Sequence, residues 1–183
     1  AQAGAIIVGI IDKNGGVINK DGYNFDEIKS LLEERSSNSL KAENMLSFEE
    51  ANEVIWSVGA EIFVPAAASR LLTKAQLDIM IDNGLGVISS GANVPFADKE
   101  IFFGPISKSA DERVSVLPDF IANCGMARAF SYFMEDNCQM NDTSIFKAVS
   151  NTIKDAIQNT YNINNNKTNI SKTAFEIALK KLI

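Results

Sequence analysis

Histidine is absent from this sequence of 183 residues. Its absence excludes a Ser-His-Asp or Cys-His relay and a histidine-ligated zinc site built from this chain alone. Cysteine is scarce: Cys124 and Cys138 have neither a metal-binding spacing nor a disulfide framework around them, so no metal site is expected. Any reaction therefore needs another base, another chain or a cofactor.

Long apolar runs and clustered positive charge are also lacking. The longest apolar runs, such as residues 5–11, are of strand length, well short of the ~20 residues that cross a bilayer. The net charge is −6, from 17 Lys and Arg against 23 Asp and Glu, and no basic stripe occurs. These features disfavour a membrane or a nucleic acid as partner. No secretory signal is visible, although a chain that begins at Ala1 could have lost one. The two cysteines fit buried or indifferent thiols in a reducing cytosol. We expect a cytoplasmic protein, or one of the mitochondrial matrix in a eukaryote.

What the sequence contains is an alternation of strand and helix patterns. Apolar residues 5–11 predict a strand covered on both faces of a sheet. Shorter strands are predicted at residues 60–64, 87–88 and 114–117, and helices at 26–34, 47–56, 73–83, 119–134, 145–157 and 175–179. An Asn-rich segment, 162–169, is expected to be an exposed linker. The alternation predicts an α/β fold with a mostly parallel sheet.

Small or acidic residues follow three of the predicted strands. Asp12 ends the first strand before a glycine turn, where the second strand of a dinucleotide-binding fold carries a carboxylate that faces the adenosine ribose. The loops Pro65-Ala66-Ala67 and Gly91-Ala92-Asn93 follow two other strands. This edge of an open parallel sheet binds ligands. Taken singly, each loop also fits a tight turn, and Asp12 fits a turn residue that bonds its own backbone.

The phosphate-binding Gly-x-Gly-x-x-Gly that lies about 20 residues upstream of such an acidic residue does not occur ahead of Asp12. We therefore expect a Rossmann-like, mostly parallel sheet with flanking helices and a helical C-terminus, from which the first strand and the glycine-rich loop are absent. Unpaired neighbouring strands would lose about 1–3 kcal/mol for each unsatisfied backbone group. We expect another polypeptide, a partner fragment or a substitute pairing to supply that strand. The chain would be one partial dinucleotide-binding domain, residues 1–183, with a cofactor core to about residue 136 and C-terminal helices at 137–183.

Four motifs occur in the order of a known family. They lie at residues 12–22 (DKNGGVINKDG), 62–67 (IFVPAA), 91–95 (GANVP) and 117–125 (LPDFIANCG), and the tail 172–179 (KTAFEIAL) follows them. Together they resemble the glutamate/leucine/phenylalanine/valine dehydrogenases. The resemblance implies the cofactor-binding part of an enzyme that oxidatively deaminates an L-amino acid, such as glutamate, to its 2-oxo acid and ammonia. In such an enzyme hydride passes to NAD or NADP.

The resemblance also implies roles for single residues. Asp12 would lie near the adenosine ribose, the two small-residue loops would line the cofactor, and Asn93 and Asn123 would lie near the nicotinamide. An acidic residue at Asp12 favours NAD in general, but the choice between NAD and NADP stays open. The family's catalytic lysine and aspartate lie in an N-terminal domain that no segment here matches. We therefore expect this segment to be inactive until it is joined to that domain, and we expect a homo-oligomer, as is common among relatives.

Some positions depart from the family pattern. Met126 stands where a second glycine is usual, and its side chain would crowd the nicotinamide or substrate pocket. Ser90 replaces a common glutamate, and Val94 replaces a common glycine. These departures leave open a non-catalytic nucleotide-binding or assembly module derived from the family.

The candidate substrate-binding residues are Ser131, Phe130 and Arg128. Ser131 resembles the serine that holds the substrate side chain in glutamate-specific members, but it lies one residue further from Asn123 than usual. On a continuous helix one residue is a rotation of about 100°, which would put Phe130 at the pocket instead. Arg128 is a candidate for a substrate carboxylate or, alternatively, a salt-bridged surface group. The asparagines have turn or helix-cap roles as alternatives, and the amino acid substrate stays open.

Overall fold

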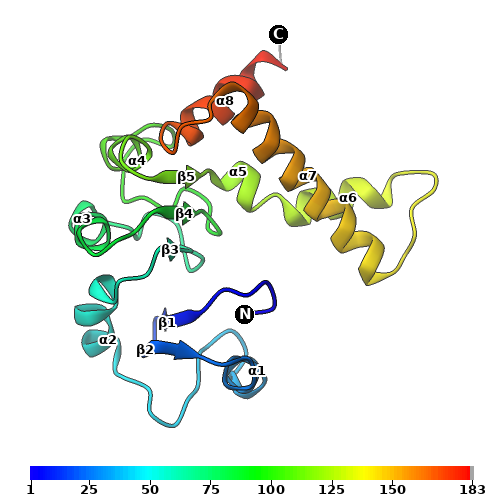
Figure 1. The fold of residues 1–183 in the computed structure, drawn as a ribbon. Coiled ribbons are helices and arrows are strands. Elements are labelled where there is room, and N and C mark those ends of the chain that lie inside the picture. The colour runs from blue at the N-terminus through cyan, green and yellow to red at the C-terminus, as the bar shows by residue number, and fades with distance from the viewer. Residues whose placement is uncertain (182–183) are drawn as a thin grey trace. The chain divides into compact units, whose positions relative to one another are not determined.

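The computed structural model describes residues 1–181 (Figure 1). The chain divides into two compact units: unit 1 is Ala1–Glu61 with Ala75–Leu85, and unit 2 is Ile62–Lys74 with Gly86–Ile183. This division does not coincide with the boundary expected near residue 136. The assignment of the chain to one partial dinucleotide-binding domain stays a prediction.

Unit 1 is built on a hairpin of β1 (Ile7–Asp12) and β2 (Gly15–Tyr23), in which Asp12 pairs with Gly15. The strand predicted at 5–11 exists, but the prediction that both its faces are covered within a mostly parallel sheet is wrong. β1 pairs antiparallel with β2, and all its residues are only half-buried. The reason is local: the Asn14 amide donates to the Asp12 carboxylate at 2.7 Å, and the chain reverses within two residues. The next strand in sequence thereby becomes the neighbour.

Two helices of unit 1, α1 and α2, begin at polar caps. α1 (Phe25–Glu34) is capped by Asn24. α2 (Phe48–Val54) begins with a capping box, in which Ser47 accepts from the Glu50 amide and Glu50 accepts from the Ser47 amide. A 3₁₀ turn (Ile55–Ser57) follows it. α3 (Lys74–Asp82), whose first residue belongs to unit 2, buries Leu77 and Met80. The helices predicted at 26–34, 47–56 and 73–83 are thus confirmed.

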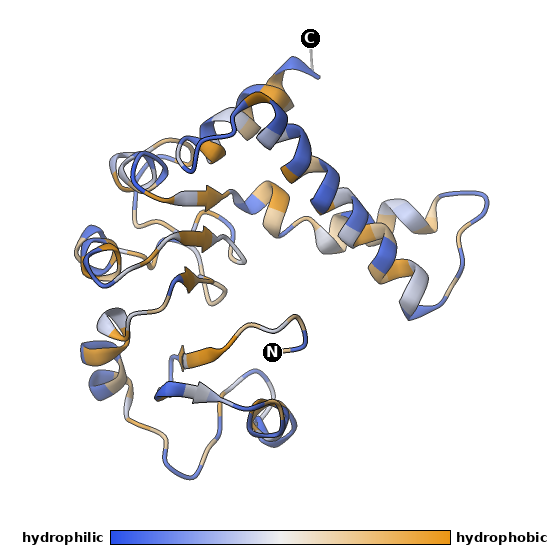
Figure 2. Ribbon diagram, viewed as in Figure 1, coloured by the Kyte–Doolittle hydropathy of each residue, from blue (hydrophilic) through white to orange (hydrophobic). Residues whose placement is uncertain are grey.

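Unit 2 is built on a parallel sheet. Its strands are β3 (Ile62–Phe63), β4 (Val87–Ser89) and β5 (Ser115–Leu117), in the order β3-β4-β5. Ile88, at the centre of the middle strand, is fully buried and pairs with Phe63 and Val116. The strands are among the most hydrophobic parts of the ribbon (Figure 2). The α/β class with a parallel sheet and flanking helices is confirmed.

Five helices complete the described part of unit 2. They are α4 (Pro105–Asp111), α5 (Asp119–Ala122), α6 (Gly125–Phe133), α7 (Asp142–Ile163) and α8 (Ile170–Lys180). α4 and α8 pack on β5, and α7 packs against α5, α6 and α8. The sequence patterns did not predict α4. The helical C-terminus is confirmed.

The single helix predicted at 119–134 is wrong. α5 ends at Ala122, and Asn123 leaves the helical conformation with φ −109° and ψ 16°. A new helix, α6, begins at Gly125. The side chain of Asn123 therefore sits at a break between two helices rather than within one.

Most residues of the segment predicted to be an exposed linker, 162–169, are exposed, but two features differ from a linker. α7 continues to Ile163, and Asn164 is half-buried. Its side-chain amide donates to the carbonyls of Thr168, at 2.9 Å, and Asn169, at 3.2 Å. The Asn169 amide in turn donates to the Asp111 carbonyl at 2.6 Å. These bonds hold the α7–α8 connection to the end of α4.

Asp111 is a buried carboxylate at this junction. It is only 4% exposed. Its oxygens accept from the backbone amides of Ser171, at 2.8 Å, and Lys172, at 3.0 Å, in the first turn of α8. Burial raises the pKa of the Asp111 carboxyl, and the amide donors oppose that shift only in part. Asp111 thus satisfies helix-terminal donors that have no partner within α8.

The raised pKa of Asp111 predicts a pH-dependent stability. An aspartate in the unfolded chain has a pKa of about 3.9, so the folded chain holds this proton more tightly. The proton on Asp111 therefore stabilises the folded state. This contribution to the free energy of unfolding is complete below the unfolded pKa and is lost as pH rises through the raised folded pKa. The free energy of unfolding of the parent chain, minus that of Asp111→Asn, should therefore fall across this window. Urea denaturation at stepped pH measures it, and a difference that stayed flat or rose would contradict the prediction.

Candidate functional site

Loops follow the carboxyl ends of the unit 2 strands, and two of them are the small-residue loops that the sequence predicted. The loop Pro65-Ala66-Ala67 follows β3, and Gly91-Ala92-Asn93 follows β4. They are in direct contact, since the Ala92 amide donates to the Pro65 carbonyl at 2.7 Å. A Cβ on Gly91 would lie 3.1 Å from the Ala66 Cβ, closer than ordinary packing. Small residues are therefore needed where these two loops meet.

The third loop brings the two candidate asparagines together. The Asn123 side-chain Nδ2 donates to Asn93 Oδ1 at 2.8 Å, although the residues are 30 positions apart. Both residues are exposed. This bond leaves Asn93 with its amide protons and Asn123 with its oxygen. The pair therefore presents a donor and an acceptor side by side, which is the set that a primary amide such as a carboxamide requires.

Asp119 connects the same two loops, and the sequence reasoning did not identify it as a site residue. Its Oδ2 accepts from the Val94 amide at 2.7 Å, and its Oδ1 accepts from the Phe120 amide at 2.8 Å. Its carbonyl accepts from the Asn123 amide at 2.7 Å. The available signal was its place directly after a strand and Pro118, much as Asp12 follows the first strand.

A second set of bonds holds the far side of the Asn93 loop. The Val94 carbonyl accepts from the Arg70 amide at 2.8 Å, and the Pro95 carbonyl accepts from the amides of Leu71, at 3.1 Å, and Leu72, at 3.0 Å. The Arg70 guanidinium also donates to the carbonyl of Asp98. The loop that carries Asn93 is therefore fixed from two directions.

Asp98 is a further residue that the sequence reasoning missed. It is 6% exposed, and its carboxylate accepts from the amides of Ile106 and Ser107, both at 2.8 Å, at the start of α4. A Cβ on Gly104 would lie 2.4 Å from the Asp98 side chain. Both carboxylate oxygens of Asp98 thus serve to attach the start of α4.

Val94 has a left-handed backbone conformation, with φ +45°. For an L-residue this conformation costs about 1–2 kcal/mol, whereas glycine there would add only about 0.5–1 kcal/mol of backbone entropy loss on folding. We expect Val94→Gly to raise the free energy of unfolding by about 1 kcal/mol, since strain relief exceeds the entropy term. Chemical denaturation measures this change. Val64→Gly, at a position outside the left-handed residues of the described chain, is the control and should lower it; a loss of stability in both variants would contradict the prediction.

Arg128 has partners within unit 2. Its guanidinium lies 2.8 Å from a Glu135 carboxylate oxygen, its Nε donates to Thr152 Oγ1 at 3.0 Å, and its Cζ lies 5.7 Å from the centre of the Tyr132 ring. This geometry is that of a salt-bridged group. The binding of a substrate carboxylate by Arg128 stays a prediction, and it would require competition with Glu135.

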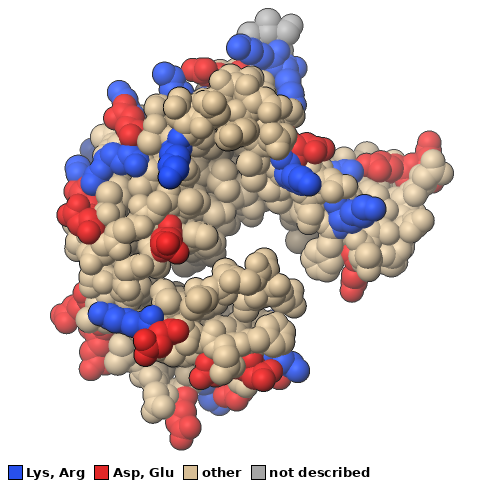
Figure 3. Space-filling model, in the orientation of Figure 1, with Lys and Arg blue, Asp and Glu red and all other residues tan. Residues whose placement is uncertain are grey.

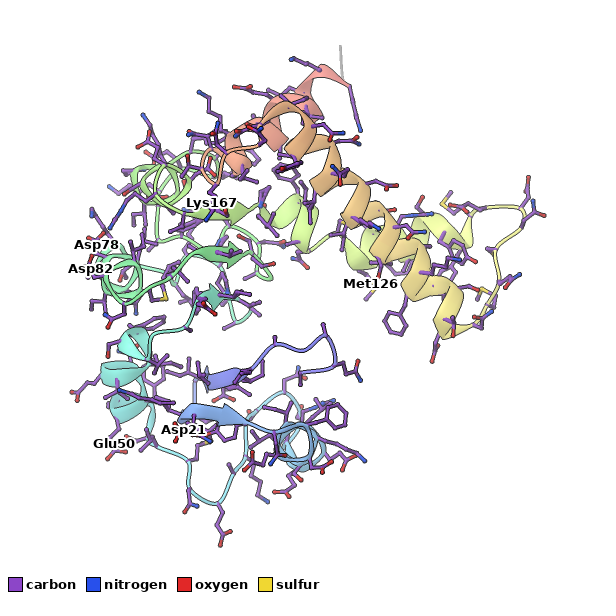
Figure 4. The ribbon with its side chains drawn as sticks, in the orientation of Figure 1. Asp21, Glu50, Asp78, Asp82, Met126 and Lys167 are labelled. Atoms are coloured by element: carbon purple, nitrogen blue, oxygen red, sulfur yellow. The ribbon has the colours of Figure 1, made fainter. Side chains whose placement is uncertain are left out.

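The other substrate-binding candidates lie on α6. Phe130 is 62% exposed and its neighbour Ser131 is exposed. The helical count from Asn123 that favoured Phe130 does not apply, because the chain is not helical between Asn123 and Gly125. Met126, in the first turn of α6, is 69% exposed (Figure 4). Which of these side chains meets a substrate stays a prediction.

Asp12 lies in unit 1, at the end of β1 as predicted. Its two carboxylate oxygens accept from the backbone amides of Asn14, at 2.7 Å, and Leu40, at 2.5 Å. The bond from Asn14 is the turn contact of the alternative interpretation, whereas the bond from Leu40 joins a segment 28 positions away. An ionised carboxylate has about four acceptor positions, so ribose hydroxyls can still bind. The ribose contact stays a prediction.

A pocket beside the unit 2 loops is small, with a volume of about 50 Å³, and its lining includes Ser90, Val94, Phe96, Asp98, Asp119 and Phe175. That is room for a few waters, so a dinucleotide would have to lie over the exposed loops. Lys and Arg are interspersed with Asp and Glu on the face shown in Figure 3. Among residues 1–181, no helix is both long and apolar enough to cross a bilayer, and no three His, Cys, Asp or Glu side chains gather as metal ligands.

Known proteins with related sequences are dehydrogenases. Residues 1–183 match the family described as Glutamate/Leucine/Phenylalanine/Valine dehydrogenase. NAD-specific glutamate dehydrogenase A of Halobacterium salinarum is 30% identical over 130 residues, which are 71% of this chain and 27% of the relative. NADP-specific glutamate dehydrogenase of Psychrobacter sp. (strain TAD1) is 26% identical over 137 residues, 73% of this chain and 30% of the relative.

Solved structures share the fold. Plasmodium falciparum glutamate dehydrogenase 2 matches with a TM-score of 0.65 at 18% identity, over 94% of this chain and 39% of that chain. Another Plasmodium falciparum glutamate dehydrogenase matches with a TM-score of 0.63 at 16% identity, over 92% and 38%. The chain thus spans less than a third of its curated relatives. With the motifs, the parallel sheet and the match over its whole length, the chain belongs to the glutamate/leucine/phenylalanine/valine dehydrogenase family.

Proposed function

We propose that this chain is the cofactor-binding part of an NAD(P)-dependent amino acid dehydrogenase, with Asn93 and Asn123 binding the nicotinamide carboxamide. The observation that carries the proposal is the 2.8 Å bond between the two side-chain amides at the carboxyl edge of a parallel sheet. Family membership and the names of the relatives, which include NAD-specific and NADP-specific enzymes, support it.

The donor set of this edge fits such a cofactor. Asn93 can donate to the carboxamide oxygen while Asn123 accepts from the carboxamide nitrogen. Gly91 has no side chain, and the adjacent Ala66 has only a methyl group. A flat ring can therefore approach the backbone of these loops. The bound cofactor would accept hydride from the substrate. The residues of this chain would orient the ring, and the groups that move protons would come from outside it.

Further parts of the proposal follow from the family. The substrate is an L-amino acid, with Ser131, Phe130 and Arg128 as the candidates to contact it. The active protein is a homo-oligomer that includes an N-terminal domain. Asp12 contacts the adenosine ribose, and the loop Pro65-Ala66-Ala67 lines the cofactor. Each of these statements is a prediction for this chain.

The test is a calorimetric titration of the protein, produced as its gene encodes it, with NAD⁺ and with NADP⁺. We expect binding of at least one, and Asn123→Ala should weaken it by about 10-fold, the loss of about one hydrogen bond of 1–1.5 kcal/mol. Asn159→Ala, at an exposed asparagine on α7, is the control and should leave the affinity unchanged. Absence of heat with both dinucleotides would refute the proposal.

A non-catalytic nucleotide-binding or assembly module is the second candidate function. The 69% exposure of the Met126 side chain, three residues beyond Asn123, favours it, because a bulky group there crowds the place of a substrate. The discriminating measurement is dinucleotide-dependent oxidation of Glu, Leu, Val and Phe by the same preparation. Binding without turnover of any of the four would favour the module.

A further inference from the structure

We propose that Asp119 is the positioning residue for the asparagine pair, holding Asn93 and Asn123 at the separation that a nicotinamide carboxamide needs. This inference rests on the proposed function. It goes beyond that function by assigning a role to a side chain whose carboxylate accepts from the backbone amides of Val94 and Phe120. Asp119 is half-buried and is the first residue of α5, just after the end of β5.

The first argument concerns the loop of Asn93. Asp119 Oδ2 accepts from the Val94 amide at 2.7 Å, a length typical of a charge-assisted hydrogen bond. Val94 is held in a left-handed conformation, with φ +45°, which a β-branched residue rarely adopts without constraint. The carboxylate thus accepts a hydrogen bond from the amide of the strained residue itself. It therefore fixes the backbone immediately after Asn93.

The second argument concerns Asn123. Its backbone amide donates to the Asp119 carbonyl at 2.7 Å, which closes the single turn of α5 and ends the helix at Asn123. Asp119 Oδ1 also accepts from the Phe120 amide at 2.8 Å, which sets the direction in which this turn begins. The side chain of Asn123 can then reach Asn93 Oδ1 at 2.8 Å. One residue thus binds both backbone segments that the amide pair joins.

A neutral side chain at position 119 would hold fewer of these backbone amides. The carboxylate uses one oxygen for Val94 and the other for Phe120. An asparagine in its place has a single acceptor oxygen, and its NH₂ group would face an N–H donor. Asp119→Asn should therefore keep one of the two bonds, and Asp119→Ala should keep neither. This difference gives a graded series of variants.

The test compares each dinucleotide with its 3-acetylpyridine analogue, in which a methyl group replaces the carboxamide NH₂. Calorimetry on the protein as its gene encodes it gives the ratio of the two dissociation constants. The parent should prefer the carboxamide by about 10-fold, the loss of one hydrogen bond. The ratio should fall to about 1 in Asp119→Ala and lie between the two values in Asp119→Asn.

Asp111→Ala is the matched control, because Asp111 also accepts two backbone amides in unit 2 but belongs to the junction of α4 and α8. It should lower stability and leave the ratio at the parent value. A parental ratio in folded Asp119→Ala, whatever the overall affinity, would overturn the positioning role. A parent that binds the carboxamide and its analogue equally would overturn it as well. A parent that binds neither NAD⁺ nor NADP⁺ would instead refute the proposed function.

Discussion

Ile88→Ala is expected to lower the free energy of unfolding by about 2–5 kcal/mol. Ile88 is the middle residue of β4, the central strand of the unit 2 sheet, and none of its side chain is exposed. Removing three methyl or methylene groups there loses their transfer free energy and leaves a cavity between β3 and β5 partners that cannot fully close. Urea denaturation followed by circular dichroism measures the change.

Ile62→Ala is the matched control for this prediction. Ile62 lies on β3, at the edge of the same sheet, and is 55% exposed. The same chemical change should lower the free energy of unfolding by only about 0.5 kcal/mol. Equal losses in the two variants would mean that Ile88 is not the central packing residue of unit 2.

Gly15→Ala is expected to destabilise unit 1 by about 3 kcal/mol or more, since backbone strain and lost hydrogen bonds add. Gly15 has φ +146°, and a Cβ there would lie 2.1 Å from the carbonyl oxygen of Leu46. That obstacle is backbone and cannot rotate away. The adjoining Gly16 exchanges two hydrogen bonds with Leu46, at 3.1 and 2.8 Å, which the displacement would break. Hydrogen exchange at the amides of Gly16 and Leu46 measures the local loss.

Gly84→Ala separates strain from steric overlap. Gly84 also has a left-handed conformation, with φ +100°, but a Cβ there would meet nothing within 4 Å. We expect a loss of about 1–2 kcal/mol, from the conformation alone. If Gly15→Ala were no worse than Gly84→Ala, the predicted clash with Leu46 would be wrong.

In the candidate site, the motifs could be predicted from the sequence and the contacts between them could not. The loop Gly91-Ala92-Asn93 and Asn123 were recognisable because each follows a strand signal and belongs to a motif of known order. The contact between Asn93 and Asn123 was not, because it depends on the break between α5 and α6. Asp119 was overlooked because its contact is also a tertiary one: its partner Val94 lies 25 residues away in the sequence.

Errors in the fold have a similar origin. The pattern at residues 5–11 correctly predicted a strand, yet an apolar run does not distinguish a parallel neighbour from an antiparallel one. The turn between Asp12 and Gly15 decided it. The Asn-rich segment looked featureless because its residues are polar, and its order comes from bonds to Asp111 and within the turn at Asn164.

The sequence by itself determined many local features of this protein: most of its helices, four of its strands, the capping box at Ser47, the small-residue loops and the family motifs. These depend on interactions within a few residues or on side-chain type alone, so they can be identified before the chain is folded. Only the tertiary structure decided that Asp119 bonds to Val94, that Asn123 reaches Asn93 and that Arg128 pairs with Glu135. Such contacts join segments whose separation is set by the packing of helices on a sheet, and that packing depends on the whole of unit 2.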